Sequence, residues 1–228
     1  MLQTNRRILT YILSLLLLFL TGCAADTALR QTAPVEQETY PTITAPRDRK
    51  LIAILGFENK STYASDKLWD TSARLLFTGI LEQGYFRVVE WEKMKQLFDW
   101  DTLATANLVK SPEKRGEARK ILLCEYFLTG AVTFFDVSQV AEVSAMSKRK
   151  TFQTTIRVDL LLQDARTGEY LSAAAGEATE RQEFNGGLTG GQTGTWDPGS
   201  ADVALNRAIR QALHRLTLSY SRSAGGVK

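Results

Sequence analysis

The sequence predicts an α+β fold in which helices pack on the faces of a mixed β-sheet. Three observations predict it: an almost wholly apolar run at residues 50–57, a strictly alternating segment at residues 151–162, and an apolar stripe at helical spacing over residues 201–216. A short apolar run is typical of a strand buried on both faces, whereas alternation is typical of a strand buried on one face. With the elements between them, the predicted order is β-α-β-α-α-β-β-β-α.

The N-terminal half of the predicted domain alternates strands and helices. Its elements, in chain order, are a strand at 50–57, a helix at 67–83, a strand at 85–90, and helices at 91–100 and 112–123. Gly84 follows the first helix, and glycine is favoured at a helix end because it readily adopts the left-handed conformation. In the helix at 91–100, we expect Met94, Leu97 and Phe98 to point into the core.

The C-terminal half is predicted to contain three strands and a final helix. The strands span residues 125–135, 151–162 and 169–175, and a turn at 165–168 joins the last two as an antiparallel hairpin. Ser200 is placed to cap the final helix, because a serine side chain can accept hydrogen bonds from the free N–H groups of a first turn. His214 falls on the solvated face of this helix, opposite the apolar stripe.

The composition excludes several classes of protein. The chain has 228 residues, with 28 Lys and Arg, 25 Asp and Glu, one His and two Cys. So few His and Cys argue against a Ser-His-Asp triad, a Cys-rich metal site and a disulfide-stapled scaffold. A formal net charge of +3 lacks the clear basic excess of nucleic-acid-binding domains. We therefore expect no metal, no cofactor and no nucleic acid partner, and we interpret Cys124 as a small buried apolar residue.

The N-terminus has the pattern of a bacterial secretory signal. Arg6 and Arg7 precede an uncharged run at residues 8–20, which is too short to span a bilayer as a helix, because that needs about 20 residues. The run ends in Leu20, Thr21, Gly22 and Cys23, a sequence that resembles a lipobox. An ordinary secretory signal followed by a chance cysteine is the alternative, and the length disfavours a transmembrane anchor.

The lipobox resemblance implies cleavage before Cys23, followed by acylation of its thiol and its new amine with chains such as palmitate. Buried acyl methylenes contribute about 0.8 kcal/mol each, so two or more chains anchor a protein stably. Ala24 follows the cysteine, at the position where an Asp would favour retention in the inner membrane. The resemblance therefore implies anchoring in the outer membrane, with the protein facing the periplasm.

The chain divides into four predicted regions. These are a lipoprotein signal peptide at 1–22, a lipidated N-terminus and flexible tether at 23–49, a periplasmic domain at 50–220 and a disordered tail at 221–228. Pro34, Pro41 and Pro46 break any helix in the tether. When fully extended, the tether reaches at most about 85 Å, which lets the domain stand away from the membrane.

Three features could carry chemistry, but each has a simpler structural interpretation. The glycine-rich segment at 185–194 lacks the Lys-Ser/Thr of a phosphate-binding loop, and we interpret it as a loop. Glu177, Glu180 and Glu183 could form a metal site, yet a solvated segment explains their spacing as well. Residues 148–150 form a basic tip that could touch lipid headgroups or be a solvated turn. We therefore expect no catalytic residue and no enzyme activity.

Six short motifs follow one another through the predicted domain. They are Ala53-Ile-Leu-Gly-Phe57, Leu75-Leu-Phe-Thr-Gly-Ile-Leu81, Tyr85-Phe-Arg-Val-Val-Glu90, Phe127-Leu-Thr-Gly130, Ile156-Arg-Val-Asp-Leu160 and Ala165-Arg-Thr-Gly-Glu169. In this order, and closed by the final helix, they resemble the CsgG family, the outer-membrane lipoproteins of curli secretion and their relatives. No single motif is very specific, but the series covers nearly the whole domain from residue 51 to residue 218.

The resemblance implies a ring of protomers through which unfolded fibre subunits pass, each protomer adding two β-hairpins to a membrane channel. Residues 136–150 and 176–194 occupy the hairpin positions, and the loop at 59–66 is shorter than the family's constriction loop. The second hairpin segment is charged on both faces, and a lipid-facing charge costs on the order of 2–4 kcal/mol at mid-bilayer. We therefore expect it not to insert, so that the periplasmic domain is better supported than the pore.

Two functional hypotheses follow. In the favoured one, the chain is a ring-forming component of a curli-type fibre-assembly or export apparatus, together with secretion or fibre-assembly partners. In the alternative, it is a periplasmic lipoprotein module that activates a cell-wall synthase, a penicillin-binding protein, at the end of its tether. The tether is short for that reach, and the final helix resembles CsgG more closely.

Overall fold

The computed structural model describes residues 31–32, 40–63, 65, 67–143, 148–186 and 194–225. These residues belong to two compact units. One unit comprises Thr32–Gln139, Phe152–Gln182 and Trp196–Lys228, and it contains the hydrophobic core. The other comprises Met1–Gln31, Val140–Thr151 and Glu183–Thr195, and most of its described residues are strand ends.

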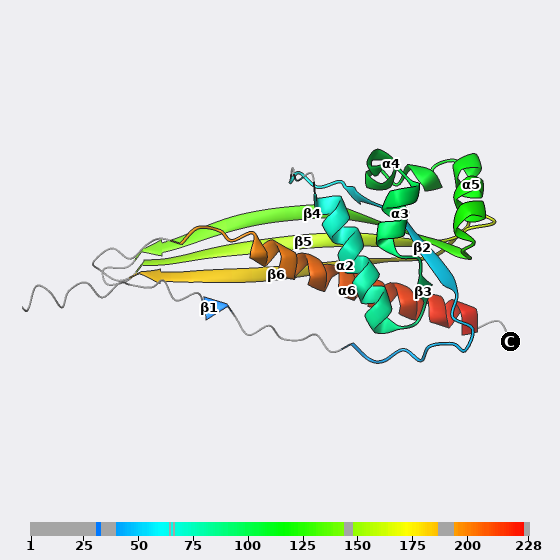
Figure 1. The fold of residues 1–228 in the computed structure, drawn as a ribbon. Coiled ribbons are helices and arrows are strands. Elements are labelled where there is room, and N and C mark those ends of the chain that lie inside the picture. Colours follow the sequence, from blue (N-terminus) through cyan, green and yellow to red (C-terminus); the bar gives the residue numbers. More distant parts are fainter. Residues whose placement is uncertain are drawn as a thin grey trace, which may run out of the picture. The chain divides into compact units, whose positions relative to one another are not determined.

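The helices and strands follow the predicted order, with the short elements β1, α4 and η1 in addition (Figure 1). The strands are β1 (Gln31–Thr32), β2 (Leu51–Asn59), β3 (Arg87–Val88), β4 (Tyr126–Val143), β5 (Lys148–Asp164) and β6 (Tyr170–Gly186). The helices are α2 (Leu68–Gln83), α3 (Trp91–Leu97), α4 (Trp100–Ala104), the 3₁₀ helix η1 (Asn107–Val109), α5 (Pro112–Leu122) and α6 (Gly199–Gly225).

The strands form one mixed sheet in the order β1-β6-β5-β4-β2-β3, which confirms the predicted fold class. β2 runs parallel to both β3 and β4, whereas β4, β5 and β6 follow one another in alternating directions (Figure 1). Residues 52–57 of β2 are buried throughout, as predicted for a strand covered on both faces. The helices α2 and α4 both pack against this strand.

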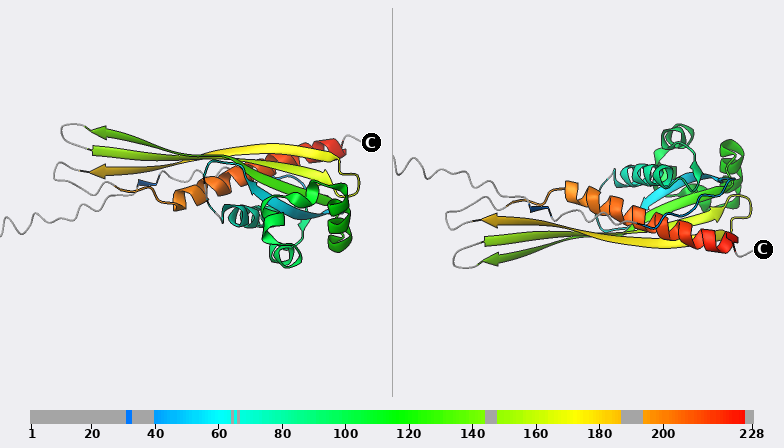
Figure 2. Two further views of the ribbon diagram at one scale, coloured as in Figure 1. Left: turned by 90° about the horizontal axis from the view of Figure 1, so that it is seen from above. Right: turned by 90° about the horizontal axis from the view of Figure 1, so that it is seen from below.

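The pair α2 and α6 packs on the sheet over much of the core, to which α3, α4, η1 and α5 also contribute buried residues. Every second side chain of β5, from Phe152 to Leu162, is buried, which confirms the alternation predicted for this strand. In the predicted stripe on α6, Ala201 is half-buried and the other seven residues are buried: Ala204, Leu205, Ala208, Ile209, Ala212, Leu213 and Leu216. α6 lies along β6 in both views of Figure 2, and the hydroxyl of Ser172 donates to the carbonyl oxygen of Leu216 at 3.1 Å.

Three strands are longer than the sequence predicts. The predicted strands at 125–135, 151–162 and 169–175 are parts of β4, β5 and β6, which include much of the two segments assigned to the hairpin positions. Most side chains from Asp136 to Glu142 are exposed, so this stretch of β4 has no continuous buried face. Hydrogen bonds between neighbouring backbones, rather than side-chain burial, therefore define the extension of β4. In the extension of β6, by contrast, alternate residues are buried: Gly176, Glu180 and Gln182.

Two predicted details of the helices were wrong. Leu97 is 41% exposed instead of pointing into the core, because α3 ends at Leu97 and a new helix, α4, starts at Trp100. Ser200 does not cap α6, because this helix already begins at Gly199. The carboxylate of Asp197 instead accepts the N–H of Gly199 at 2.8 Å.

The end of the segment predicted as a tether packs against α2 and α6. Ile43 packs against the core, and the ring of Tyr40 stacks on the imidazole of His214 with their centroids 4.8 Å apart. His214 is therefore half-buried and not fully solvated as predicted. Burial, together with the neighbouring charge of Arg215, lowers the pKa of His214 below its ordinary value.

Candidate functional site

The predicted lipidation residue Cys23 and the lipobox residues Leu20, Thr21 and Gly22 lie outside the described residues. Their role stays a prediction from the sequence. Most of the glycine-rich segment, residues 187–193, lies outside them as well. The candidate sites described below therefore all belong to the domain.

The described domain contains a groove of about 800 Å³. It is lined by β4, β5 and β6, by the end of β2, and by η1 and the start of α5. Four of its five β5 residues, Arg157, Asp159, Leu161 and Gln163, alternate with the core residues of that strand, and the fifth is the core residue Leu160. The groove therefore lies on the face of β5 opposite the core between sheet and α6. We call it the sheet groove.

The sheet groove carries charges of both signs, and its cationic side chains outnumber its carboxylates. Glu58, whose side chain is only 16% exposed, pairs with Lys60 at 2.9 Å and with Lys110 at 3.1 Å. Arg157 pairs with Asp159 on the same strand at 3.4 Å. With Arg115, the groove has four cationic side chains and two carboxylates along its lining. Its local potential is therefore positive.

Backbone contacts hold the α5 side of the groove in place. The guanidinium of Arg115 donates to the carbonyl oxygen of Val109 at 3.0 Å, which ties α5 to η1. The same guanidinium lies against Gly168, where an added Cβ would come within 2.6 Å of its Nη2 atom. The turn at 165–168, predicted from the sequence, thus also positions a cation beside the groove.

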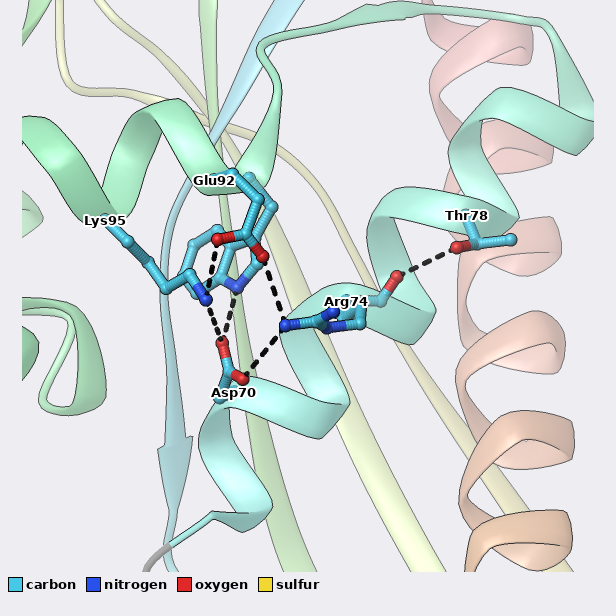
Figure 3. Close-up of polar contacts among 6 residues, drawn as sticks. Asp70, Arg74, Thr78, Glu92 and Lys95 are labelled. Atoms are coloured by element: carbon cyan, nitrogen blue, oxygen red, sulfur yellow. Dashed lines mark hydrogen bonds and ion pairs between the residues drawn. The ribbon is translucent and has the colours of Figure 1, made fainter.

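A cluster of ion pairs joins α2 to α3 (Figure 3). Asp70 accepts the indole N–H of Trp91 at 2.8 Å and lies 3.4 Å from the ammonium of Lys95, while Arg74 and Lys95 both pair with Glu92. Burial alone would raise the pKa of Asp70, but the Trp91 hydrogen bond and the charge of Lys95 outweigh it and lower that pKa. Because every charge here has a partner, we interpret the cluster as structural.

A second ion pair corrects the interpretation of residues 177–183 as a solvated segment. These residues belong to β6, and the side chain of Glu180 is only 6% exposed. Its carboxylate lies 3.0 Å from the guanidinium of Arg207 on α6. A carboxylate is buried in this way only when it is paired, so Glu180 connects the sheet to the final helix.

Cys124 is buried, with 3% of its surface exposed, as predicted. Burial raises the pKa of its thiol to about 12, and a buried protonated thiol is unreactive. Within the described ranges, no group of three or more His, Cys, Asp or Glu residues is arranged to hold a metal ion.

None of the helices in the described part of the chain is both long enough and apolar enough to cross a membrane.

Comparison with models of protein families shows to which family the chain belongs. Residues 36–220 match the family model of the curli production assembly/transport component CsgG. The chain belongs to the CsgG family. No significant match is found among curated proteins.

Several solved structures resemble this CsgG-family chain at low sequence identity. Lipoprotein GNA1162 from Neisseria meningitidis is 14% identical, with a TM-score of 0.42, covering 63% of this chain and 88% of its own. The PelC dodecamer from Paraburkholderia phytofirmans is 11% identical, with a TM-score of 0.40 and coverages of 76% and 92%. The C-terminal domain of LpoB from Salmonella enterica is 12% identical, with a TM-score of 0.39 and coverages of 59% and 84%.

Two of the motifs that suggested the CsgG family are partners in the sheet. The motif at 53–57 lies on β2 and the motif at 127–130 on β4, with Ala53 opposite Phe127 and Phe57 opposite Gly130. An added Cβ at Gly130 would collide with the Phe57 ring, so the glycine of one motif makes room for the aromatic ring of the other. The two motifs are therefore in direct contact in the fold.

Proposed function

We propose that this protein is a lipid-anchored outer-membrane lipoprotein that faces the periplasm and acts as an oligomeric, non-catalytic component of a curli-type fibre-assembly or export apparatus. The match of residues 36–220 to the CsgG family model carries this proposal. The lipobox at Leu20 to Cys23 supports membrane attachment independently of that match.

The proposal is tested by the size of the protein extracted from membranes in mild detergent. We expect light scattering to give a mass of several protomers, because the resemblance implies a ring of identical subunits. Only monomers, at every concentration at which the protein remains soluble, would contradict the assembly. Co-purification of a penicillin-binding protein with such monomers would favour the cell-wall synthase hypothesis instead.

Membrane attachment gives a separate prediction for the two cysteines. We expect Cys23→Ala to abolish incorporation of labelled palmitate and to release the protein from the membrane fraction, because the acyl chains are its anchor. Cys124→Ala is the matched control: its buried, unreactive thiol offers no acylation site, so this variant should stay in the membrane. Retention of the Cys23→Ala protein in outer membranes after a high-salt wash would contradict the anchoring proposal.

A further inference from the structure

We propose that the sheet groove binds an extended acidic peptide segment of a partner protein. This inference concerns the domain alone and does not depend on the proposed fibre-assembly role. It rests on the size of the groove, on a buried polar group without a partner, and on the balance of charge along its lining.

The dimensions of the sheet groove suit a ligand of several residues. Its volume of about 800 Å³ lies within the range of roughly 300–1,000 Å³ that is typical of ligand sites. Apart from Tyr170, the side chains of β4 and β6 that line it are small, Ala131 and Ala173 among them. A peptide backbone can therefore approach the sheet closely there, while Leu161 and Tyr170 expose apolar surface for its side chains.

Gln163 supplies a hydrogen-bonding group that the described protein leaves unused. Only 4% of its surface is exposed, and its amide nitrogen donates to the carbonyl oxygen of Gly168 at 2.6 Å. Its Oε1 atom is buried and has no hydrogen-bond partner among the described residues, and the same holds for the hydroxyl of Thr133, which also lines the groove. An unpaired buried polar group is unfavourable in the free protein, and a peptide backbone would satisfy both groups once a shift of the lining side chains exposes them.

The charges favour an acidic peptide over a neutral or basic one. Lys60 and Lys110 share the single carboxylate of Glu58, so the two ammonium groups are only partly neutralised. Their side chains are 60% and 57% exposed, and that of Arg157 is 50% exposed, so all three can turn towards a bound carboxylate. Acidic side chains spaced along an extended peptide would meet these cations in succession.

The test is fluorescence polarisation with the full-length, detergent-solubilised lipoprotein and a labelled peptide of alternating Asp and Val. We expect saturable binding that weakens as salt is added, and binding at least about tenfold weaker to the same peptide with Lys in place of Asp. Equal binding of the two peptides would overturn the proposal. Displacement of the acidic peptide by an acidic oligosaccharide that binds more tightly would also overturn it.

Two variants on one face of β6 locate the site. Ala173 and Thr179 are both exposed, and their even separation along the strand places them on the same face, but only Ala173 lines the sheet groove. We expect Ala173→Trp to fill the groove and weaken peptide binding at least about tenfold, and Thr179→Trp to leave it unchanged. Arg157→Glu, at a half-exposed position, should weaken acidic peptide binding and reduce its salt dependence. Equal affinity for Ala173→Trp and unmodified protein would place the peptide elsewhere.

Discussion

Replacing Gly56 by alanine is expected to destabilise the domain by at least about 3 kcal/mol, enough to unfold a protein of ordinary stability in part. Gly56 has φ 148°, a conformation that residues with a side chain rarely adopt, and it marks a shift of register between β2 and β4. An added Cβ would also lie 2.7 Å from the Cα of Ala106, next to η1. Backbone strain and a backbone collision therefore act together.

The matched control is Gly116→Ala. Gly116 lies inside α5, where an added Cβ meets nothing within 4 Å. Alanine is favoured over glycine in a helix by about 1 kcal/mol, so this variant should be unchanged or slightly more stable. Urea unfolding followed by circular dichroism measures both free energies of unfolding, and a loss below about 1 kcal/mol for Gly56→Ala would refute the close approach of η1 to β2.

The same glycine shows how far the sequence could be interpreted. Its place in the motif at 53–57 was visible, as was the buried strand around it, because a run of apolar residues is a local signal. The contact of Gly56 with Ala106 could not be predicted, because no local sequence signal indicates that residues about fifty positions later pack on β2. The helix end at Gly84, with φ 65°, was predicted because a left-handed helix end depends on one residue and not on a contact across the fold.

The extended parts of β4 and β6 were missed because the sequence signal for a strand is an apolar face. Residues 136–142 are almost all exposed, and the buried positions of β6 include the polar residues Glu180 and Gln182, so that the charges at 177–183 suggested a solvated segment. The sheet groove was missed for a related reason. Its lining comes from six elements, and residues such as Lys60 and Gln163 become neighbours only when the sheet has formed. The predicted lipobox, by contrast, is a continuous motif that requires no fold to be recognised.

Removing either partner of the ion pair between Glu180 and Arg207 is expected to destabilise the domain. The losses of stability caused by Arg207→Met and Glu180→Met should be unequal. We expect Arg207→Met to cost about 3–5 kcal/mol, because it leaves a carboxylate with 6% exposure without its cation. Glu180→Met should cost less, about 1–2 kcal/mol, because the Arg207 side chain is 22% exposed and its long stem can carry the charge to water.

The double variant separates attraction within the pair from burial of each charge. When both residues are methionine, no charge remains buried, so most of the loss caused by Arg207→Met should be regained, and the single effects should not add. Arg210→Met is the matched control on the same helix, because Arg210 and its partner Glu82 are 43% and 48% exposed. Exposed pairs contribute at most about 1 kcal/mol. Equal losses for Arg207→Met and Arg210→Met in urea unfolding would mean that the Glu180 carboxylate reaches water, and that the ion pair adds little to the packing and hydrogen bonds that hold α6 on β6.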